Sequence, residues 1–179
     1  MNDPLESLLL QLDNHWEKDI ILKRNDFLVN LGDKNTNLYF VKKGSLRVFI
    51  DDEVEEHTIR FGYKNSVITA LDCFLTNKPT SFYIQAIKKC ELKVISKSNF
   101  DAFINSKSEL KAIWKTLLES FVHQQIEREI DLITYSPQKR FERVWERSPQ
   151  LFQEIPLKYI ASYLRMTPET LSRILKKLD

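Results

Sequence analysis

The stretch IPLKYIASYLRMTPETLSRILKKLD, residues 155–179, decides the C-terminal part of the fold. It holds two apolar-periodic segments, and the inner face of the first consists of Ile160, Ala161 and Leu164. Thr167 is a good helix cap and Pro168 suits the first helical position, so a second helix begins there. Its inner face, at helical spacing, consists of Leu171, Ile174, Leu175 and Leu178. We expect two short helices joined by a turn at residues 165–167.

The outer face of the second helix carries side chains suited to DNA: Thr167, Glu169, Thr170, Ser172, Arg173, Lys176 and Lys177. Two helices joined by a tight turn form a helix-turn-helix, whose second helix fits the major groove. Arg173 can donate two hydrogen bonds to guanine, and Glu169 can accept one from cytosine. The positive end of the helix dipole at Thr167 favours a phosphate. A helical hairpin with a merely solvated face is the alternative.

The segments before the long helix show two other sequence patterns. Residues 3–16 have the spacing of an amphipathic helix. Residues 20–95 read as short strands separated by turns, which is typical of a sandwich or barrel. Two of these runs, in NLYFVKKGSLRVFI, are split at Gly44, which is free to take a positive φ.

A long helix is predicted over residues 106–133, about 28 residues or roughly 42 Å. Its apolar stripe includes Leu110, Trp114, Leu117, Phe121 and Gln125 as the expected dimer contacts. So long a stripe usually packs on a helix of a second copy of the chain, although it could instead lie across the β domain. Two capping patterns, Ser98 with Asp101 and Ser106 with Glu109, predict helix starts on either side.

The composition describes an ordinary soluble protein of 179 residues with 42% hydrophobic and 29% charged residues. Residues 137–179 hold nine Lys and Arg against five acids, and the preceding residues hold 18 bases and 20 acids. This basic tail suits a polyanionic partner, or it is a solvated surface. No apolar run is long enough to span a bilayer, and the N-terminus has no basic segment of a signal peptide. We therefore expect a cytoplasmic protein without membrane contact.

Catalytic and metal-binding patterns are missing from the sequence. Cys73 and Cys90 have no metal-ligand spacing, and two thiols are too few for a four-cysteine iron–sulfur cluster. The three histidines are isolated, and no nucleophile–base set or phosphate-binding glycine loop is present. We expect neither an enzyme nor a metal or cofactor, and both cysteines are expected to be packing residues.

The whole chain resembles the Crp/Fnr family of bacterial transcription regulators. The recognition helix of that family commonly reads Arg-Glu-Thr-Val-x-Arg, and residues 168–173 read Pro-Glu-Thr-Leu-Ser-Arg. Glu169 and Arg173 match the residues that read bases in the family, whereas Pro168 replaces its first arginine. LYFVKKGSLRVF, residues 38–49, resembles a β-roll hairpin of the family. Arg165 stands where related turns often have glycine, and a left-handed conformation there would cost roughly 1 kcal/mol.

The resemblance implies an α+β fold with three parts. These are a β-roll sensor domain of the cyclic-nucleotide-binding type at residues 1–105, a dimerisation helix at 106–134, and a helix-turn-helix at 135–179. Relatives usually continue into a small β wing, so the wing is expected to be truncated or absent. The implied partners are double-stranded DNA, a second copy of the chain and RNA polymerase.

The effector pocket implied by the resemblance is degenerate. The family holds a cyclic nucleotide with a Gly-Glu pair and an Arg followed by Ser or Thr, and these positions fall on Thr69, Ala70, Thr80 and Ser81. Both charged anchors are therefore missing, and Lys78 is a nearby cation without the fork geometry of arginine. We expect no cyclic AMP binding. A different small effector, or none, stays open.

A second class of function is a small-ligand sensor or scaffold that does not bind DNA and carries a decayed C-terminal module. A decayed module would not be expected to keep a threonine cap, a clean apolar stripe and outward Glu and Arg together. The sequence therefore favours the transcription regulator.

Overall fold

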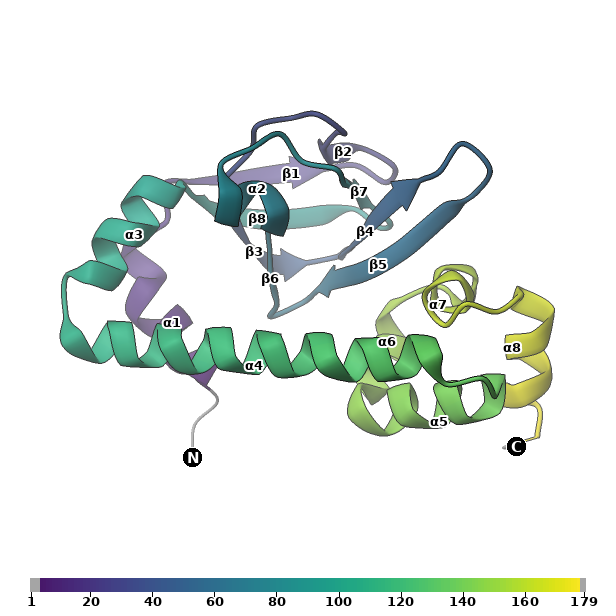
Figure 1. Cartoon of the computed structure of the whole chain (residues 1–179). Coiled ribbons are helices and arrows are strands. Elements are labelled where there is room, and N and C mark those ends of the chain that lie inside the picture. Colours follow the sequence, from purple (N-terminus) through teal and green to yellow (C-terminus); the bar gives the residue numbers. More distant parts are fainter. Residues whose placement is uncertain (1–3, 178–179) are drawn as a thin grey trace.

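The computed structural model describes residues 4–177, which form a β-roll, a long helix along one side of it, and a group of short helices at the far end of that helix (Figure 1). The strands are β1 (Lys18–Leu22), β2 (Phe27–Val29), β3 (Leu38–Lys43), β4 (Ser45–Asp51), β5 (Glu56–Tyr63), β6 (Val67–Ile68), β7 (Tyr83–Ala86) and β8 (Cys90–Ile95). The helices are α1 (Pro4–Leu12), α2 (Leu71–Thr76), α3 (Lys97–Asn105), α4 (Ser108–Ile133), α5 (Pro137–Arg147), α6 (Pro149–Glu154), α7 (Leu157–Tyr163) and α8 (Pro168–Leu175), with a 3-10 turn at Asp13–His15.

The roll consists of two antiparallel four-stranded sheets, in the orders β1-β8-β3-β6 and β2-β7-β4-β5. The consecutive strands β3 and β4 lie in different sheets, so residues 38–49 are not the hairpin suggested by the resemblance. The chain crosses between the sheets at Gly44, whose φ is +88°. A Cβ there would clash with the carbonyl oxygen of Lys89, so this crossing requires glycine.

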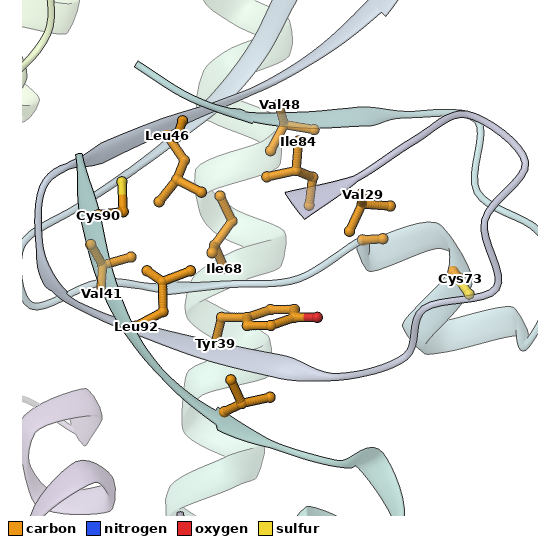
Figure 2. Packing of buried hydrophobic residues seen from close by; sticks show 13 residues of the cluster. Val29, Tyr39, Val41, Leu46, Val48, Ile68, Cys73, Ile84, Cys90 and Leu92 are labelled. Atoms are coloured by element: carbon orange, nitrogen blue, oxygen red, sulfur yellow. The ribbon is translucent and has the colours of Figure 1, made fainter. Parts of the chain in front are cut away.

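The core of the roll lies between the two sheets. Val41 and Leu92 from one sheet point toward Leu46 and Ile84 from the other, and all four are fully buried (Figure 2). The period-2 alternation of the strands places these residues inward. Cys90 belongs to the same cluster, and it is a free thiol like Cys73, as expected for packing residues.

A second apolar cluster joins α1, α3 and the first half of α4 below the roll. The start of α3 is capped by Ser96, whose hydroxyl accepts from the Asn99 backbone N–H, so the cap predicted at Ser98 is wrong. The cap predicted at Ser106 is also wrong: α4 begins at Ser108, and the Ser106 hydroxyl donates instead to the Phe103 carbonyl. Both segments contain the [ST]-x-x-[DE] capping pattern. At α3 the cap is instead a serine two residues earlier, and at α4 the serine hydroxyl is used in a local turn.

A third cluster joins α5 to α8 and reaches the roll through Ile87. Its fully buried members include Ile160, Ala161, Leu164 and Leu171, which confirms the predicted inner faces apart from Leu178, a residue outside the described chain. Within residues 4–177 no strand follows α8, and the expectation about the wing stays a prediction. None of the described helices combines the length and apolarity that crossing a membrane requires.

Candidate nucleic-acid interface and effector pocket

Helices α7 and α8 lie where the helix-turn-helix is predicted, and local chemistry sets the turn between them. Arg165 takes the left-handed conformation with φ +53°, as expected for the position where related turns have glycine. The Thr167 hydroxyl accepts from the Thr170 N–H at 3.2 Å, and Pro168 occupies the first turn of α8. The turn therefore stores a small conformational strain beside a well-formed helix cap.

The outer face of α8 collects the predicted DNA-reading side chains. Glu169, Ser172, Arg173, Lys176 and Lys177 are all exposed. The pKa of the Glu169 carboxyl lies below its usual range, because it accepts hydrogen bonds from its own backbone N–H and from the Thr167 hydroxyl. A hydrogen-bond acceptor and a donor are thus presented one helical turn apart, which is the chemistry that base edges require.

Thr170, another predicted DNA-contacting residue, also makes local contacts. Its side chain is half-buried, and its hydroxyl lies 3.1 Å from the Thr167 hydroxyl and 3.5 Å from Arg173 Nη2. Thr167 and Thr170 therefore order the start of α8, and Thr170 positions the guanidinium of Arg173 at the helix surface.

Two arginines that sequence reasoning missed hold the end of α7. Arg128 on α4 donates from Nη2 to the Tyr163 carbonyl at 2.5 Å, and its guanidinium lies over the Tyr163 ring. Arg140 on α5 donates from Nε to the carbonyl of Leu164. Carbonyl groups at a helix C-terminus lack partners inside the helix, so these arginines satisfy them and fix the turn.

An ion-pair cluster joins α4 to α5. Asp131 is fully buried, and Arg143 Nε reaches its Oδ1 at 2.9 Å while Arg147 Nη2 bonds Oδ2. Glu127, one turn earlier on α4, accepts from Arg143 Nη2 at 2.8 Å. Removing one partner from such a buried cluster is costly, so α4 and α5 are held in one arrangement.

The first helix of the motif is docked on the roll. The Ser162 hydroxyl on α7 accepts from the Thr58 N–H and donates to the Glu56 carbonyl, both at 3.1 Å. Arg165 Nη1 lies 2.7 Å from Nδ1 of His57, on the same strand. Strand β5 therefore uses free backbone groups of its edge to hold α7.

The predicted effector positions lie on and around α2, where two of them, Thr80 and Ser81, bind an internal carboxylate. The Thr80 hydroxyl donates to Asp72 Oδ1 and the Ser81 N–H to Oδ2, both at 2.7 Å. Ala70 is buried, and the side chain of Lys78 is exposed. Thr69 donates to the Asn37 carbonyl. Asp72 was missed, because its role follows from the short helix α2 inside a segment that reads as loop.

The predicted dimer residues do not share one free surface. Leu110 and Leu117 are buried in their own chain, and Trp114 packs with them. Phe121 is half-buried and Gln125 is exposed. Apart from Leu132, the exposed large apolar residues of α4 form a neighbouring row: Leu118, Val122, Ile126, Ile130 and Ile133. The stripe was thus correctly placed on α4, but its first half covers the roll, the alternative kept open above.

Comparisons with known proteins agree with this architecture. Residues 20–107 match the family described as the cyclic nucleotide-binding domain. A CooA variant from Carboxydothermus hydrogenoformans is 15% identical with a TM-score of 0.76, covering 99% of this chain and 84% of its own. FixK2 from Bradyrhizobium japonicum is 14% identical with a TM-score of 0.72, covering 90% and 83%.

The catabolite activator protein of Thermus thermophilus is 20% identical with a TM-score of 0.59, covering 98% of this chain and 86% of its own. No curated protein sequence matches the chain significantly. At these identities the likeness concerns the fold. Residues 20–107 thus belong to the cyclic nucleotide-binding domain family, and the chain as a whole has the fold of the Crp/Fnr regulators.

Proposed function

We propose that this protein is a transcription regulator of the Crp/Fnr type that binds a two-fold symmetric DNA site as a homodimer. The observation that carries the proposal is the outer face of α8, where Glu169 and Arg173 lie exposed one turn apart with Lys176 and Lys177 beyond them. The capped helix, the arginine-held turn and the basic C-terminal part support the same reading.

The second copy is proposed to pack along the exposed row of α4. Val122 is 62% exposed and Ile126 49%, and they lie one turn apart between Leu118 and Ile130. A row at i, i+4, i+8 on a 26-residue helix is the seam that a second helix covers. Pairing there would place two copies of α8 on one assembly, as a site with two half-sites about one helical turn apart requires.

The regulator is proposed not to respond to cyclic AMP or cyclic GMP. Thr80 and Ser81, which the resemblance aligns with the phosphate-binding Arg-Ser pair, already donate to the carboxylate of Asp72. A cyclic phosphate would have to approach this carboxylate without a nearby arginine, so like-charge repulsion would replace attraction.

Selection of bound sequences from a random pool of duplex DNA tests the proposal. We expect a palindromic motif whose two halves are read alike, and Glu169→Ala together with Arg173→Ala should abolish its enrichment. The alternative, a sensor or scaffold that does not bind DNA, predicts no enriched motif with the wild-type chain at low salt, where even non-specific DNA binding is strong.

A further inference from the structure

The tip of the β4–β5 hairpin is strongly acidic and lies beside α7. Residues 51–56 read DDEVEE, and all six are exposed. Figure 1 shows the hairpin projecting from the roll next to α7. The Ser162 hydroxyl on α7 bonds two backbone groups of β5 at this tip, the carbonyl of Glu56 and the N–H of Thr58. An acidic segment is therefore fixed close to the helices that are proposed to meet DNA, a polyanion.

Asp52 orders this tip and positions His57. Its Oδ1 accepts hydrogen bonds from the backbone N–H of Glu55 at 2.9 Å and of Val54 at 3.1 Å. Its Oδ2 lies 2.7 Å from Nε2 of His57. These bonds, the one from Glu55 foremost, lower the pKa of the Asp52 carboxyl to about 2. Asp52 is therefore a charged carboxylate that holds the imidazole in place.

His57 connects the hairpin to the turn before α8. Its Nδ1 lies 2.7 Å from Nη1 of Arg165. A guanidinium has only donors, so Nδ1 accepts this hydrogen bond and the proton of the ring is on Nε2, toward Asp52. Glu55 Oε1 lies 3.5 Å from the same Nδ1. The charge of Arg165 is thus directed toward the acidic tip.

A hollow of about 480 Å³ lies between the tip, α7 and the start of α8, and its walls carry opposite charges. Glu55 and Glu56 line the wall on the hairpin. The opposite wall includes Lys158, Arg165 and Thr167. Thr167 caps α8, whose first N–H groups and dipole attract anions, as the two basic side chains do. In the described arrangement these groups face carboxylates of the same chain.

The contact between the hairpin and α7 is polar, and the hairpin has a place to bend. The register of β4 with β5 shifts between Val48 and Phe49, and strands bend at such a bulge. Strand β5 is the last strand of its sheet, so the tip beyond the bulge has a neighbouring strand on one side only. Exposed polar contacts contribute little to stability, so this contact can open in exchange for bonds to DNA.

We propose that the β4–β5 hairpin is an autoinhibitory latch on the DNA-binding helices. Docked on α7, it holds Arg165 through His57 and places its acids where the DNA backbone has to approach α8. This inference rests on the proposed function. In the latched state, phosphates are repelled by the tip and find Arg165 already bonded. DNA binds after the hairpin has moved away from α7, and the observed affinity is lowered by the fraction of chains that are latched.

Hydrogen exchange of the Thr58 backbone N–H reports the latch without DNA, because this N–H donates to the Ser162 hydroxyl on α7. His57→Phe keeps a ring but removes the acceptor for Arg165. We expect it to speed up exchange at Thr58 about threefold or more, because local opening sets the exchange rate. His123→Phe, at an exposed position on α4, is the control and should leave this rate unchanged. A thermal melt checks that both variants are folded.

The latch also predicts tighter DNA binding when the tip loses charge. Glu53→Gln with Glu55→Gln removes two exposed acids of the tip and keeps Glu56, which pairs with Arg47 at 2.6 Å. In fluorescence anisotropy with a random-sequence duplex at low salt, this chain should bind about tenfold tighter than the wild type, because phosphates no longer meet like charges.

Asp101→Asn with Glu109→Gln is the matched control, because it removes the same charge from exposed positions on α3 and at the start of α4. The proposal is overturned if the chain with the uncharged tip binds DNA no tighter than this control, or if His57→Phe leaves exchange at Thr58 unchanged. It is also overturned if DNA slows exchange at Thr58 in the wild-type chain instead of speeding it.

The two levels of the argument fail differently. If neither the wild type nor the chain with the uncharged tip binds DNA, the proposed function is refuted together with the latch. If both bind DNA with equal affinity, only the latch is refuted.

Discussion

Arg140 Nε donates to the carbonyl oxygen of Leu164 at 2.8 Å, so a side chain of α5 closes the last turn of α7. The same guanidinium donates from Nη2 to Arg165 at 3.0 Å and from Nη1 to Thr134 at 2.6 Å. One planar group thus ties the turn between α7 and α8 to the end of α4. Among the side chains, only arginine carries several N–H donors in one rigid planar group.

Replacing Arg140 with lysine is expected to lower the free energy of unfolding by about 2–3 kcal/mol, because several buried carbonyls lose charged donors. Urea unfolding followed by circular dichroism measures the change. Lys139→Ala, at the exposed neighbouring position, is the matched control and should stay within about 0.5 kcal/mol of the wild type. An Arg140→Lys chain as stable as that control would show that the hydrogen bonds of the Arg140 guanidinium to these carbonyls do not stabilise the fold.

Arg173 is expected to contact bases and Lys177 to contact phosphates, and alanine substitutions at the two positions should have different effects on DNA binding. Arg173→Ala is expected to cost roughly 1–3 kcal/mol on the selected operator and to relax preference at one base pair in each half-site. Lys177→Ala should weaken binding to all DNA sequences alike. It should also reduce the slope of log affinity against log salt concentration by about one. Fluorescence anisotropy on operator and scrambled duplexes, at several salt concentrations, separates the two. An unchanged motif after Arg173→Ala would show that another residue reads the bases.

If the chain dimerises along the exposed row of α4, a charged side chain introduced into this row should convert the dimer to a monomer. Wild-type protein at micromolar concentration should sediment at about twice the chain mass of 21.2 kDa. Ile126→Glu should sediment as a single chain, because two desolvated carboxylates would face each other across the seam. Val54→Glu changes a valine that is 89% exposed on the roll and should stay dimeric. A wild-type monomer, or an Ile126→Glu dimer, would exclude this seam.

Cyclic AMP and cyclic GMP are expected to release no heat when titrated into about tens of micromolar protein, and to leave operator affinity unchanged. Losing a charge-assisted partner in a buried site costs about 2–5 kcal/mol, which moves micromolar binding toward millimolar. Asp72→Asn removes the internal negative charge and is the informative variant. Wild-type dissociation constants below about 50 µM would mean that another cation serves the phosphate.

Burial raises the pKa of the Cys90 thiol to about 11, against 9.0 when unperturbed. The native chain therefore favours the neutral thiol. The contribution of this group to the free energy of unfolding is complete below about pH 9 and is lost as the pH rises through about 11. In a Cys73→Ala background, iodoacetamide at pH 9 should label the urea-unfolded chain quickly and the native chain hardly at all. Equal labelling rates would contradict the burial.

The sequence allowed prediction of those elements whose signals are local. The periodic residues Ile160, Leu164 and Leu171 and the Thr167 cap depend only on near neighbours, and the structure has each of them. The cap at Ser136, which accepts from the Lys139 N–H, belongs to the same class.

Long-range partners were not predictable in this way. Leu117 has the same periodic signal whether it covers the roll of its own chain or a second copy, and only the tertiary arrangement separates the two. Arg128 and Arg140 look like ordinary helix-surface residues until the carbonyls 35 and 24 residues later fold back onto them. Asp72 likewise becomes informative only when Thr80 returns to it.

The carboxylate of Asp72 stands on α2, and it orders the loop that follows this helix. A tethered group has an effective concentration far above that of any free metabolite, and it cannot be diluted or depleted. The donor groups of Thr80 and Ser81 are therefore already bound by a carboxylate of the same chain. A signal that regulates this protein must act at a position whose occupancy still varies.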